Sequence, residues 1–170
     1  MSVAINFCRA TARDLDEVQA WLRDAGLPSE DLTAAHMRQF LVAISADVRV
    51  GMIGLENFGN VGLLRSLVVD SDYRSAGIGR RLVHALESKA ARSGIVEFWL
   101  LTIDADPFFS RLDYVDCERD AAPEAIRRTD EFSRLCPGDA VLMRKRLLTI
   151  PFPEHLLAIL GPGEYASDDE

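Results

Sequence analysis

The segment LLRSLVVDSDYRSAGIGRRLVHALESK, from Leu63 to Lys89, decides the fold of this 170-residue chain. It begins as an apolar strand, turns through polar residues, and then opens a helix with the pattern Arg-x-x-Gly-x-Gly at Arg74, Gly77 and Gly79. Glycines let backbone N–H groups converge, and the first turn of a helix adds unpaired donors and roughly half a positive charge. The segment therefore predicts a site for a phosphorylated ligand, such as a pyrophosphate.

The spacing within this loop discriminates between the known phosphate-binding folds. A dinucleotide-binding loop places Gly-x-Gly-x-x-Gly directly after its strand, whereas here a polar turn at residues 70–73 intervenes and Leu82 occupies the third glycine position. A nucleoside-triphosphate loop needs Gly-Lys-Ser/Thr, but two arginines follow Gly79. The glycines alone would also fit a turn without a ligand, and the combination of strand, loop and helix favours a ligand site.

The same segment resembles the coenzyme A signature of the GNAT acetyltransferases, which is R/Q-x-x-G-x-G/A after a strand that ends in Leu-x-Val. The resemblance implies acetyl-CoA as the cosubstrate and no metal. It also implies that backbone groups of Leu67 and Val69 bond the pantetheine arm, while an N–H near Val68 or Val69 polarises the thioester oxygen. We expect the coenzyme to be bound by Leu67, Val68, Val69, Arg74, Ser75, Ala76, Gly77, Ile78, Gly79 and Arg80.

The composition fits one soluble, cytoplasmic domain. The net charge of −8 argues against nucleic acid or an anionic membrane as a partner. Three arginines stand out in this acidic chain, Arg74, Arg80 and Arg81. They are either contacts to coenzyme phosphates, which we favour, or solvated surface residues. The three cysteines are widely spaced and indicate neither a disulfide framework nor a zinc site. We expect no secretory leader, because the N-terminal residues form no basic, long apolar segment, and no apolar stretch approaches the roughly 20 residues that span a bilayer.

Hydrophobic periodicity indicates a mixed α/β (α+β) protein. Ala46-Asp47 separates two apolar runs and predicts a hairpin. The resemblance implies the GNAT fold, a mixed central sheet splayed at the fourth strand with flanking helices. We expect a GNAT domain over residues 1–148 and a C-terminal extension over residues 149–170 with a partly disordered acidic tail. The expected strands are 3–7, 39–45, 48–55, 61–69, 96–103, 114–117 and 140–147, and the expected helices follow Thr11 and Ser29 and cover 78–94, 106–112 and 123–135.

Three segments resemble one GNAT branch, the arsenic-resistance-associated N-acetyltransferases. They are residues 62–69 (GLLRSLVV), 107–112 (PFFSRL) and 131–137 (EFSRLCP). The chain departs from that branch at Asp139, where a serine is usual, and at Asp113, where a glycine is usual. Trivalent arsenic favours thiolates, but the three cysteines fall on separate predicted elements, and free cysteines are usually small buried hydrophobes.

Two residues are candidates for catalysis. Glu56 ends the third strand and is the candidate base, with a surface carboxylate as the alternative. Arg65 interrupts an apolar strand, and by two-residue alternation it shares a face with Leu63, Leu67 and Val69. A buried guanidinium needs an acidic partner, which is either a substrate carboxylate or an internal one such as Glu56. We favour the internal ion pair.

The general acid is not identified by the sequence. Many GNAT enzymes use a tyrosine at the position that Phe109 occupies here, so the candidates are Ser110, Cys136 or water. We expect an N-acetyltransferase that acts by direct attack of a small-molecule amine, for which an amino acid or an analogue is one candidate. The alternatives are a degenerate acetyl-CoA sensor and an enzyme for protein N-termini or lysines. The predicted helix 123–135 is assigned to the core, to a homodimer interface or to the acceptor pocket.

Overall fold

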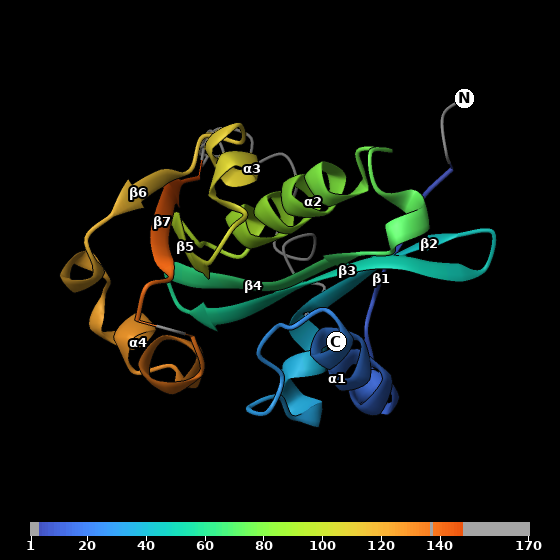
Figure 1. Ribbon diagram of the computed structural model, residues 1–170, viewed down its shortest axis with the longest axis horizontal. Coiled ribbons are helices and arrows are strands. Elements are labelled where there is room, and N and C mark those ends of the chain that lie inside the picture. The colour runs from blue at the N-terminus through green and yellow to red at the C-terminus, as the bar shows by residue number, and fades with distance from the viewer. Residues whose placement is uncertain (1–3, 137, 148–170) are drawn as a thin grey trace, which may run out of the picture.

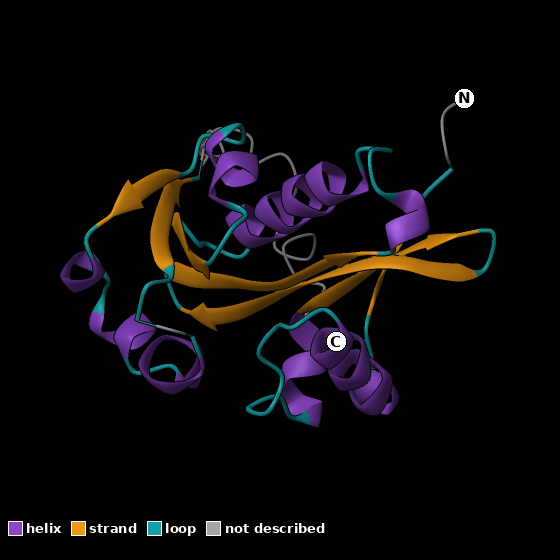
Figure 2. Ribbon diagram, in the orientation of Figure 1, coloured by secondary structure: helices purple, strands orange, loops and turns teal. Residues whose placement is uncertain are grey.

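The computed structural model describes residues 4–136 and 138–147. A seven-stranded sheet in the order β1-β2-β3-β4-β5-β7-β6 forms its centre, and helices cover both faces (Figures 1 and 2). The strands are β1 Asn6–Arg9, β2 Phe40–Ser45, β3 Val48–Phe58, β4 Val61–Val69, β5 Glu97–Thr102, β6 Val115–Cys117 and β7 Val141–Arg146. The helices are α1 Leu15–Asp24, α2 Ile78–Arg92, α3 Asp106–Ser110 and α4 Glu124–Arg127, with shorter 3₁₀ or π segments η1 Ala12–Asp14, η2 Ala34–Gln39, η3 Ser71–Tyr73, η4 Arg119–Ala121 and η5 Glu131–Leu135.

The helices divide the protein into layers. Helix α2 and the short α3 pack on one face of the sheet, while α1 and α4 lie on the opposite face at its two ends (Figure 1). The apolar positions of α2 recur at i, i+4 and are buried against the sheet, at Ile78, Leu82, Leu86 and Ala90. This arrangement confirms the predicted mixed fold with flanking helices.

The β2–β3 hairpin forms where the sequence predicts it. Ala46 and Asp47 both adopt positive φ, 47° and 64°, as the two-residue turns of right-twisted hairpins require. Further along the hairpin, Phe40 pairs with Gly54, and a Cβ added to this glycine would lie 2.4 Å from the Phe40 ring. The glycine thus leaves the space that the buried ring fills.

Strands β4 and β5 separate early, which confirms the predicted splay. Their parallel pairing covers only Val61–Leu63 against Glu97–Trp99. The antiparallel pairing of β4 with β3 continues to Val69, and β5 pairs with β7 along its whole length. The second half of β4 therefore has an open edge on the side that faces β5.

A bulge in β4 lies just beyond the point of separation. Met52 pairs with Val68, but two residues later Gly54 pairs with Arg65, so β4 carries one extra residue. Within this interval Ser66 adopts a φ of 61°, an uncommon conformation for a residue with a side chain. An extra residue reverses which side chains point to which face of the sheet.

The bulge overturns the prediction that Arg65 shares a face with Leu67 and Val69. Leu67 and Val69 pack against the core cluster on the α2 face. Arg65 instead points to the opposite face together with Leu63, which packs against α4. Two-residue alternation fails here because Ser66 breaks the period of the strand.

The predicted helix 123–135 is two short segments, α4 and η5. Between them, the Thr129 hydroxyl donates to the Ile126 carbonyl at 2.7 Å and accepts from the Phe132 N–H at 3.2 Å. A side chain that bonds the local backbone in this way competes with the regular helix. The predicted helix after Ser29 begins only at Ala34, as the 3₁₀ segment η2.

The remaining predictions concern the chain ends and membranes. The C-terminal extension at residues 149–170 lies outside the described residues, as does the start of the predicted strand 3–7. Across residues 4–136 and 138–147, no helix is both long and apolar enough to cross a bilayer.

Candidate active site

The predicted coenzyme loop connects the end of β4 to α2. Asp70 shapes its start, because its Oδ1 accepts the Asp72 N–H at 2.9 Å. Ser75 and Gly77 follow with φ values of 73° and 76°, and Gly77 is the N-cap of α2. Because the first intrahelical bond runs from the Arg81 N–H to the Gly77 carbonyl at 3.1 Å, the three preceding N–H groups of α2 have no acceptor inside the helix.

Most predicted loop residues face solvent. Arg74, Ser75, Ala76, Gly77 and Arg80 are exposed. Ile78 is an exception, since its side chain belongs to the core and only its backbone N–H can serve a ligand. Arg81 is exposed as well, and its guanidinium lies 5.6 Å from the centre of the Phe7 ring. The loop therefore offers backbone donors and two arginines, Arg74 and Arg80, to an anion.

The open edge of β4 leads from this loop into the splay. The Asp70 N–H donates to the Val50 carbonyl of β3 at 2.8 Å, so the N–H and C=O of Val69 point away from β3. The two-residue period gives Leu67 the same direction. Val68 pairs with β3, which leaves Leu67 and Val69 as the residues whose backbone faces the splay. Coenzyme binding by these groups stays a prediction.

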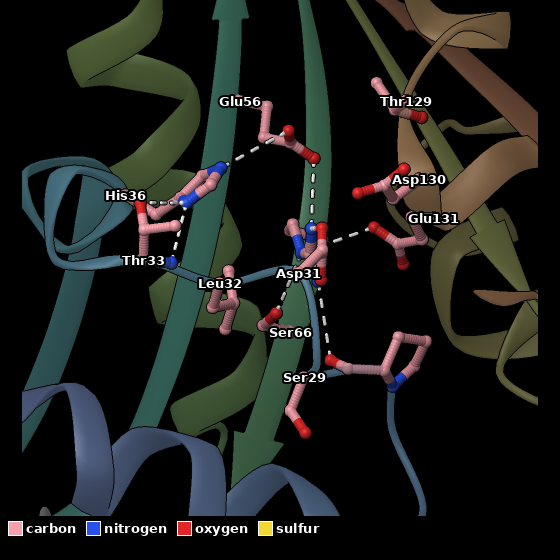
Figure 3. A network of polar contacts seen from close by, with 12 residues as sticks. Ser29, Asp31, Leu32, Thr33, His36, Glu56, Ser66, Thr129, Asp130 and Glu131 are labelled. Atoms are coloured by element: carbon pink, nitrogen blue, oxygen red, sulfur yellow. Dashed lines mark hydrogen bonds and ion pairs between the residues drawn. The ribbon is translucent and has the colours of Figure 1, made fainter. Parts of the chain in front are cut away.

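Arg65 lies at the centre of a buried ion-pair network, whose acidic members Asp31, Glu56 and Glu131 are labelled in Figure 3. Its Nη1 donates to Asp31 Oδ2 at 2.5 Å and to Glu56 Oε2 at 3.1 Å. Its Nη2 donates to Asp31 Oδ1 at 2.8 Å and to the Pro28 carbonyl at 3.4 Å, and its Nε donates to Ser66 Oγ at 3.2 Å. All five N–H groups of the guanidinium are thus engaged, which confirms the internal ion pair with Glu56.

His36 meets Glu56 on the more exposed side of this network. Its Nδ1 accepts the backbone N–H of Thr33 at 2.9 Å, so Nε2 carries the ring hydrogen. Nε2 lies 3.7 Å from Glu56 Oε1 (Figure 3). Glu56 is therefore held between His36 and Arg65, with 14% of its side chain exposed. The Glu56 side chain is thus the most exposed of the three carboxylates around Arg65, since those of Asp31 and Glu131 are each 5% exposed.

Glu131 approaches Arg65 from η5. Its Oε2 lies 3.3 Å from Arg65 Nε, and its side chain is 5% exposed. Burial, only partly opposed by the charge of Arg65, raises the pKa of Glu131 to about 7. Burial would also raise the pKa of Asp31, but hydrogen bonds and the charge of Arg65 outweigh it and hold that pKa below its usual value.

Cys136 lies beside Glu131, with its Sγ 3.9 Å from Glu131 Oε1. Burial and this carboxylate raise the pKa of the Cys136 thiol to about 12, so the thiol keeps its proton at neutral pH. Cys8 lies in β1 and Cys117 in β6, the two outer strands of the sheet, so the three cysteines do not form one thiol site. Within residues 4–136 and 138–147, no group of three His, Cys, Asp or Glu side chains is arranged to hold a metal ion.

Phe109, at the position where many GNAT enzymes have a tyrosine, is closely packed. Phe109 is 4% exposed and makes edge contacts to the rings of Phe108, at 5.0 Å, and Tyr114, at 5.4 Å. The Tyr114 hydroxyl donates to Glu87 at 3.3 Å, and burial raises its pKa. Ser110 is exposed. The structure therefore adds no side chain to the candidates for the general acid.

A separate cavity of about 270 Å³ lies between α1 and the sheet, lined in part by Trp21, Met52 and Asp70. It contains none of the predicted site residues, and of its lining only Asp70 belongs to the coenzyme loop. We assign it no part in the site, which is defined by the loop, the splay and the Arg65 network.

Comparison with solved structures places this geometry in a known fold. N-acetylglutamate synthase from Neisseria gonorrhoeae, solved with coenzyme A and N-acetyl-glutamate, matches 87% of this chain with a TM-score of 0.75 at 20% identity, over 36% of its own chain. The chain has the GNAT fold. A GNAT-family acetyltransferase from Staphylococcus aureus matches 85% of this chain and 100% of its own with a TM-score of 0.67 at 20% identity. A Mycobacterium tuberculosis protein solved with CoA and NLQ matches 84% of this chain and 99% of its own with a TM-score of 0.70 at 20% identity.

Sequence comparison supports the GNAT superfamily as well. The family described as Acetyltransferase (GNAT) domain matches residues 36–116, which include β4, the coenzyme loop and α2. An uncharacterized N-acetyltransferase from Chlorobaculum tepidum is 35% identical over 95 residues, which are 55% of this chain and 60% of that relative. The matched part of the chain therefore spans less than two thirds of the relative's length.

Sequence reasoning missed two members of the Arg65 network. Asp31 lies in the loop before η2, in a segment without any periodic signal. Glu131 belongs to the segment that resembles the arsenic-resistance-associated branch, and that resemblance was the one signal pointing to it. The predicted pair of Glu56 and Arg65 is brought together, and Asp31 and Glu131 complete its surroundings.

Proposed function

We propose that this protein is an acetyl-CoA-dependent N-acetyltransferase that acylates the amine of a small molecule by direct attack. The proposal rests on two features that lie along one strand, β4. The open backbone edge of β4 runs from the donors at the start of α2 to the Arg65 network, where Glu56 is accessible. An acetyl thioester extended along this edge would have its pyrophosphate at α2 and its reactive carbon near Glu56.

The reaction needs no covalent enzyme intermediate. The amine nitrogen attacks the thioester carbon, the new C–N bond forms, and the C–S bond breaks to release the coenzyme thiolate. An N–H of Leu67 or Val69 stabilises the charge that develops on the thioester oxygen. Holding the two reactants together contributes effective molarities of about 10⁵ M or more. Positioning therefore supplies most of the rate enhancement.

Glu56 serves as the base that takes the amine proton, directly or through a water molecule. Such a group contributes about 100- to 10,000-fold. Arg65 and His36 hold the two oxygens of this carboxylate and act as positioning residues. Water protonates the departing thiolate, because Phe109 carries no hydroxyl group.

Thiol release in the presence of an amine panel tests the proposal. We expect the wild-type protein to release coenzyme thiol with at least one small amine, and Glu56→Gln to lower kcat by about 100-fold or more. Glu118→Gln, an exposed glutamate outside the network, is the matched control and keeps the wild-type rate.

The second candidate function is an acetyl-CoA sensor without turnover, which the phenylalanine at position 109 favours. A sensor would bind acetyl-CoA in a calorimetric titration and release no thiol with any amine. That pair of results would contradict the enzymatic proposal while retaining the coenzyme site.

The GNAT branch, the acceptor, the cellular setting and the oligomeric state also belong to this proposal. The segments at residues 62–69, 107–112 and 131–137 support the arsenic-resistance-associated branch. The N-acetyl-glutamate in the Neisseria gonorrhoeae complex supports a small acceptor, for which an amino acid or an analogue is one candidate. The free cysteines support a reducing, cytoplasmic setting. A homodimer remains part of the proposal, to be tested by light scattering.

A further inference from the structure

The Arg65 network holds more negative than positive charge. Three carboxylates, from Asp31, Glu56 and Glu131, surround one guanidinium within 2.5 to 3.3 Å. His36 accepts a backbone N–H at Nδ1, and its Nε2 lies 3.7 Å from Glu56 Oε1. A buried or half-buried site with such an excess attracts a cation and repels an anion, more strongly than the same charges would in water.

Two arginines on the neighbouring elements are engaged outside the network. Arg134 of η5 is exposed and pairs with Glu30 and Asp130, at 3.9 Å and 3.7 Å. Arg119 of η4 donates to the carbonyls of Phe132 and Ala140. These pairings bring further acids to the surroundings of the network and leave its excess charge in place.

One acceptor oxygen of the network is unsatisfied. Glu131 Oε2 is buried and accepts no hydrogen bond from any described residue, although Arg65 Nε lies 3.3 Å away. A buried carboxylate oxygen without a hydrogen bond is costly, and a ligand or a proton that donates to it removes the cost. This orphan is a second observation, beside the charge excess, that indicates a donor-bearing ligand.

A substrate carboxylate has no place at Arg65. Each of its five N–H groups already donates to a partner inside the protein, and its side chain is 0% exposed. A carboxylate would have to displace Asp31 from a bidentate contact and then lie against Glu56 and Glu131. The network therefore opposes the binding of a zwitterionic amino acid through its carboxyl group.

We propose that the acceptor binds as a cation and carries no carboxylate next to its reacting amine, as in diamines or amino-acid carboxamides. The inference rests on the proposed function, because it places the acceptor at the Arg65 network beside the thioester. Glu56 and His36 are the more exposed members of the network, and the acceptor enters the network beside them. Glu56 then takes the proton of the ammonium group. The excess charge thus serves both to bind the ammonium ion and to receive its proton.

Equilibrium binding tests the inference without any turnover. The full chain is saturated with CoA, which carries no acetyl group to transfer, and is titrated at pH 7 with L-alaninamide, L-alanine or 1,3-diaminopropane by NMR. All three carry an ammonium group, and L-alanine alone carries a carboxylate. We expect L-alanine to bind at least about 10-fold more weakly than the other two. Equal or tighter binding of L-alanine, or no detectable binding of L-alaninamide, would overturn the inference.

A charge variant shows whether the network causes the preference. Glu131→Gln removes one buried carboxyl group at nearly constant volume. Because the pKa of Glu131 is about 7, the variant is compared with wild type at pH 8, where the carboxyl is mostly ionised, and we expect it to reduce the preference for L-alaninamide over L-alanine several-fold. Glu118→Gln is the control and keeps the wild-type ratio. A ratio that Glu131→Gln leaves unchanged would contradict the inference. An amide that binds as expected but never releases thiol from acetyl-CoA would instead contradict the proposed function and leave the binding inference supported.

Discussion

The buried carboxyl group of Glu131 should make the stability of the folded protein depend on pH. Its pKa is raised from 4.5 to about 7 in the folded protein, with burial as the main cause. Between these two values the native state keeps a proton that the unfolded chain has lost. Stability therefore falls as the pH rises from 4.5 through about 7, and the contribution of this group is fully present only below 4.5.

The size of this effect follows from the shift. One pKa unit corresponds to about 1.4 kcal/mol, so a rise from 4.5 to about 7 gives about 3 kcal/mol for Glu131. Its side chain is 5% exposed, so solvent screening does not reduce the figure much. In a protein of this size, 1 kcal/mol changes the melting temperature by roughly 2 to 4 °C. The group alone would lower the melting temperature by roughly 6 to 12 °C across this pH range.

Glu131→Gln isolates the contribution, because the other titrating groups are common to both proteins. Urea unfolding followed by tryptophan fluorescence gives the free energy of unfolding at pH 5, 6, 7 and 8. We expect the variant to gain about 3 kcal/mol relative to wild type between pH 5 and pH 8. Glu118→Gln, at an exposed position, should follow the wild-type curve. Parallel curves for wild type and Glu131→Gln would refute a protonated, buried Glu131.

Three further predictions concern the fold around the site. Gly54→Ala should lower the free energy of unfolding by about 1 to 3 kcal/mol, because the new Cβ would lie 2.4 Å from the Phe40 ring. Gly138→Ala is the control, since a Cβ at this position would have nothing within 4 Å. Equal effects of the two variants in urea unfolding would contradict this packing. Arg65→Met should cost about 3 to 5 kcal/mol at pH 8 and less at pH 5, as measured by thermal denaturation, and an unchanged melting temperature would contradict the ion-pair network. Asp113 adopts a φ of 73°, so Asp113→Gly should keep or raise the free energy of unfolding, whereas Asp113→Ala should lower it by about 1 kcal/mol. An alanine variant that is more stable than the glycine variant in urea unfolding would contradict a strained backbone at this position.

The elements that the sequence predicted well carry local signals. The turn between β4 and α2 follows from glycines whose positive φ is needed at that point of the chain, as at Gly77. Helix α2 follows from apolar residues at i, i+4 and from Gly94 at its end. The β2–β3 hairpin follows from two apolar runs and a short polar turn. In each case the residues that decide the structure are neighbours in the chain.

The features that the sequence did not predict depend on distant or unusual contacts. Ser66 gives no sign that it will adopt a positive φ, yet it reverses the face of every residue beyond it in β4. Asp31 reaches Arg65 from the loop before η2 and Glu131 from η5, so their contacts with Arg65 depend on the tertiary fold. The break at Thr129 depends on a hydroxyl that bonds the backbone instead of solvent.

Calorimetric titration with acetyl-CoA tests the central claim most directly. Gly77 and Gly94 bracket α2, both with positive φ, 76° and 91°, and with nothing within 4 Å of an added Cβ. Valine at either position therefore strains the backbone alike, but only Gly77→Val changes the coenzyme loop. We expect wild type and Gly94→Val to bind acetyl-CoA and Gly77→Val to bind it at least about 10-fold more weakly. No heat of binding with wild type, or equal affinity of the two variants, would contradict the central claim.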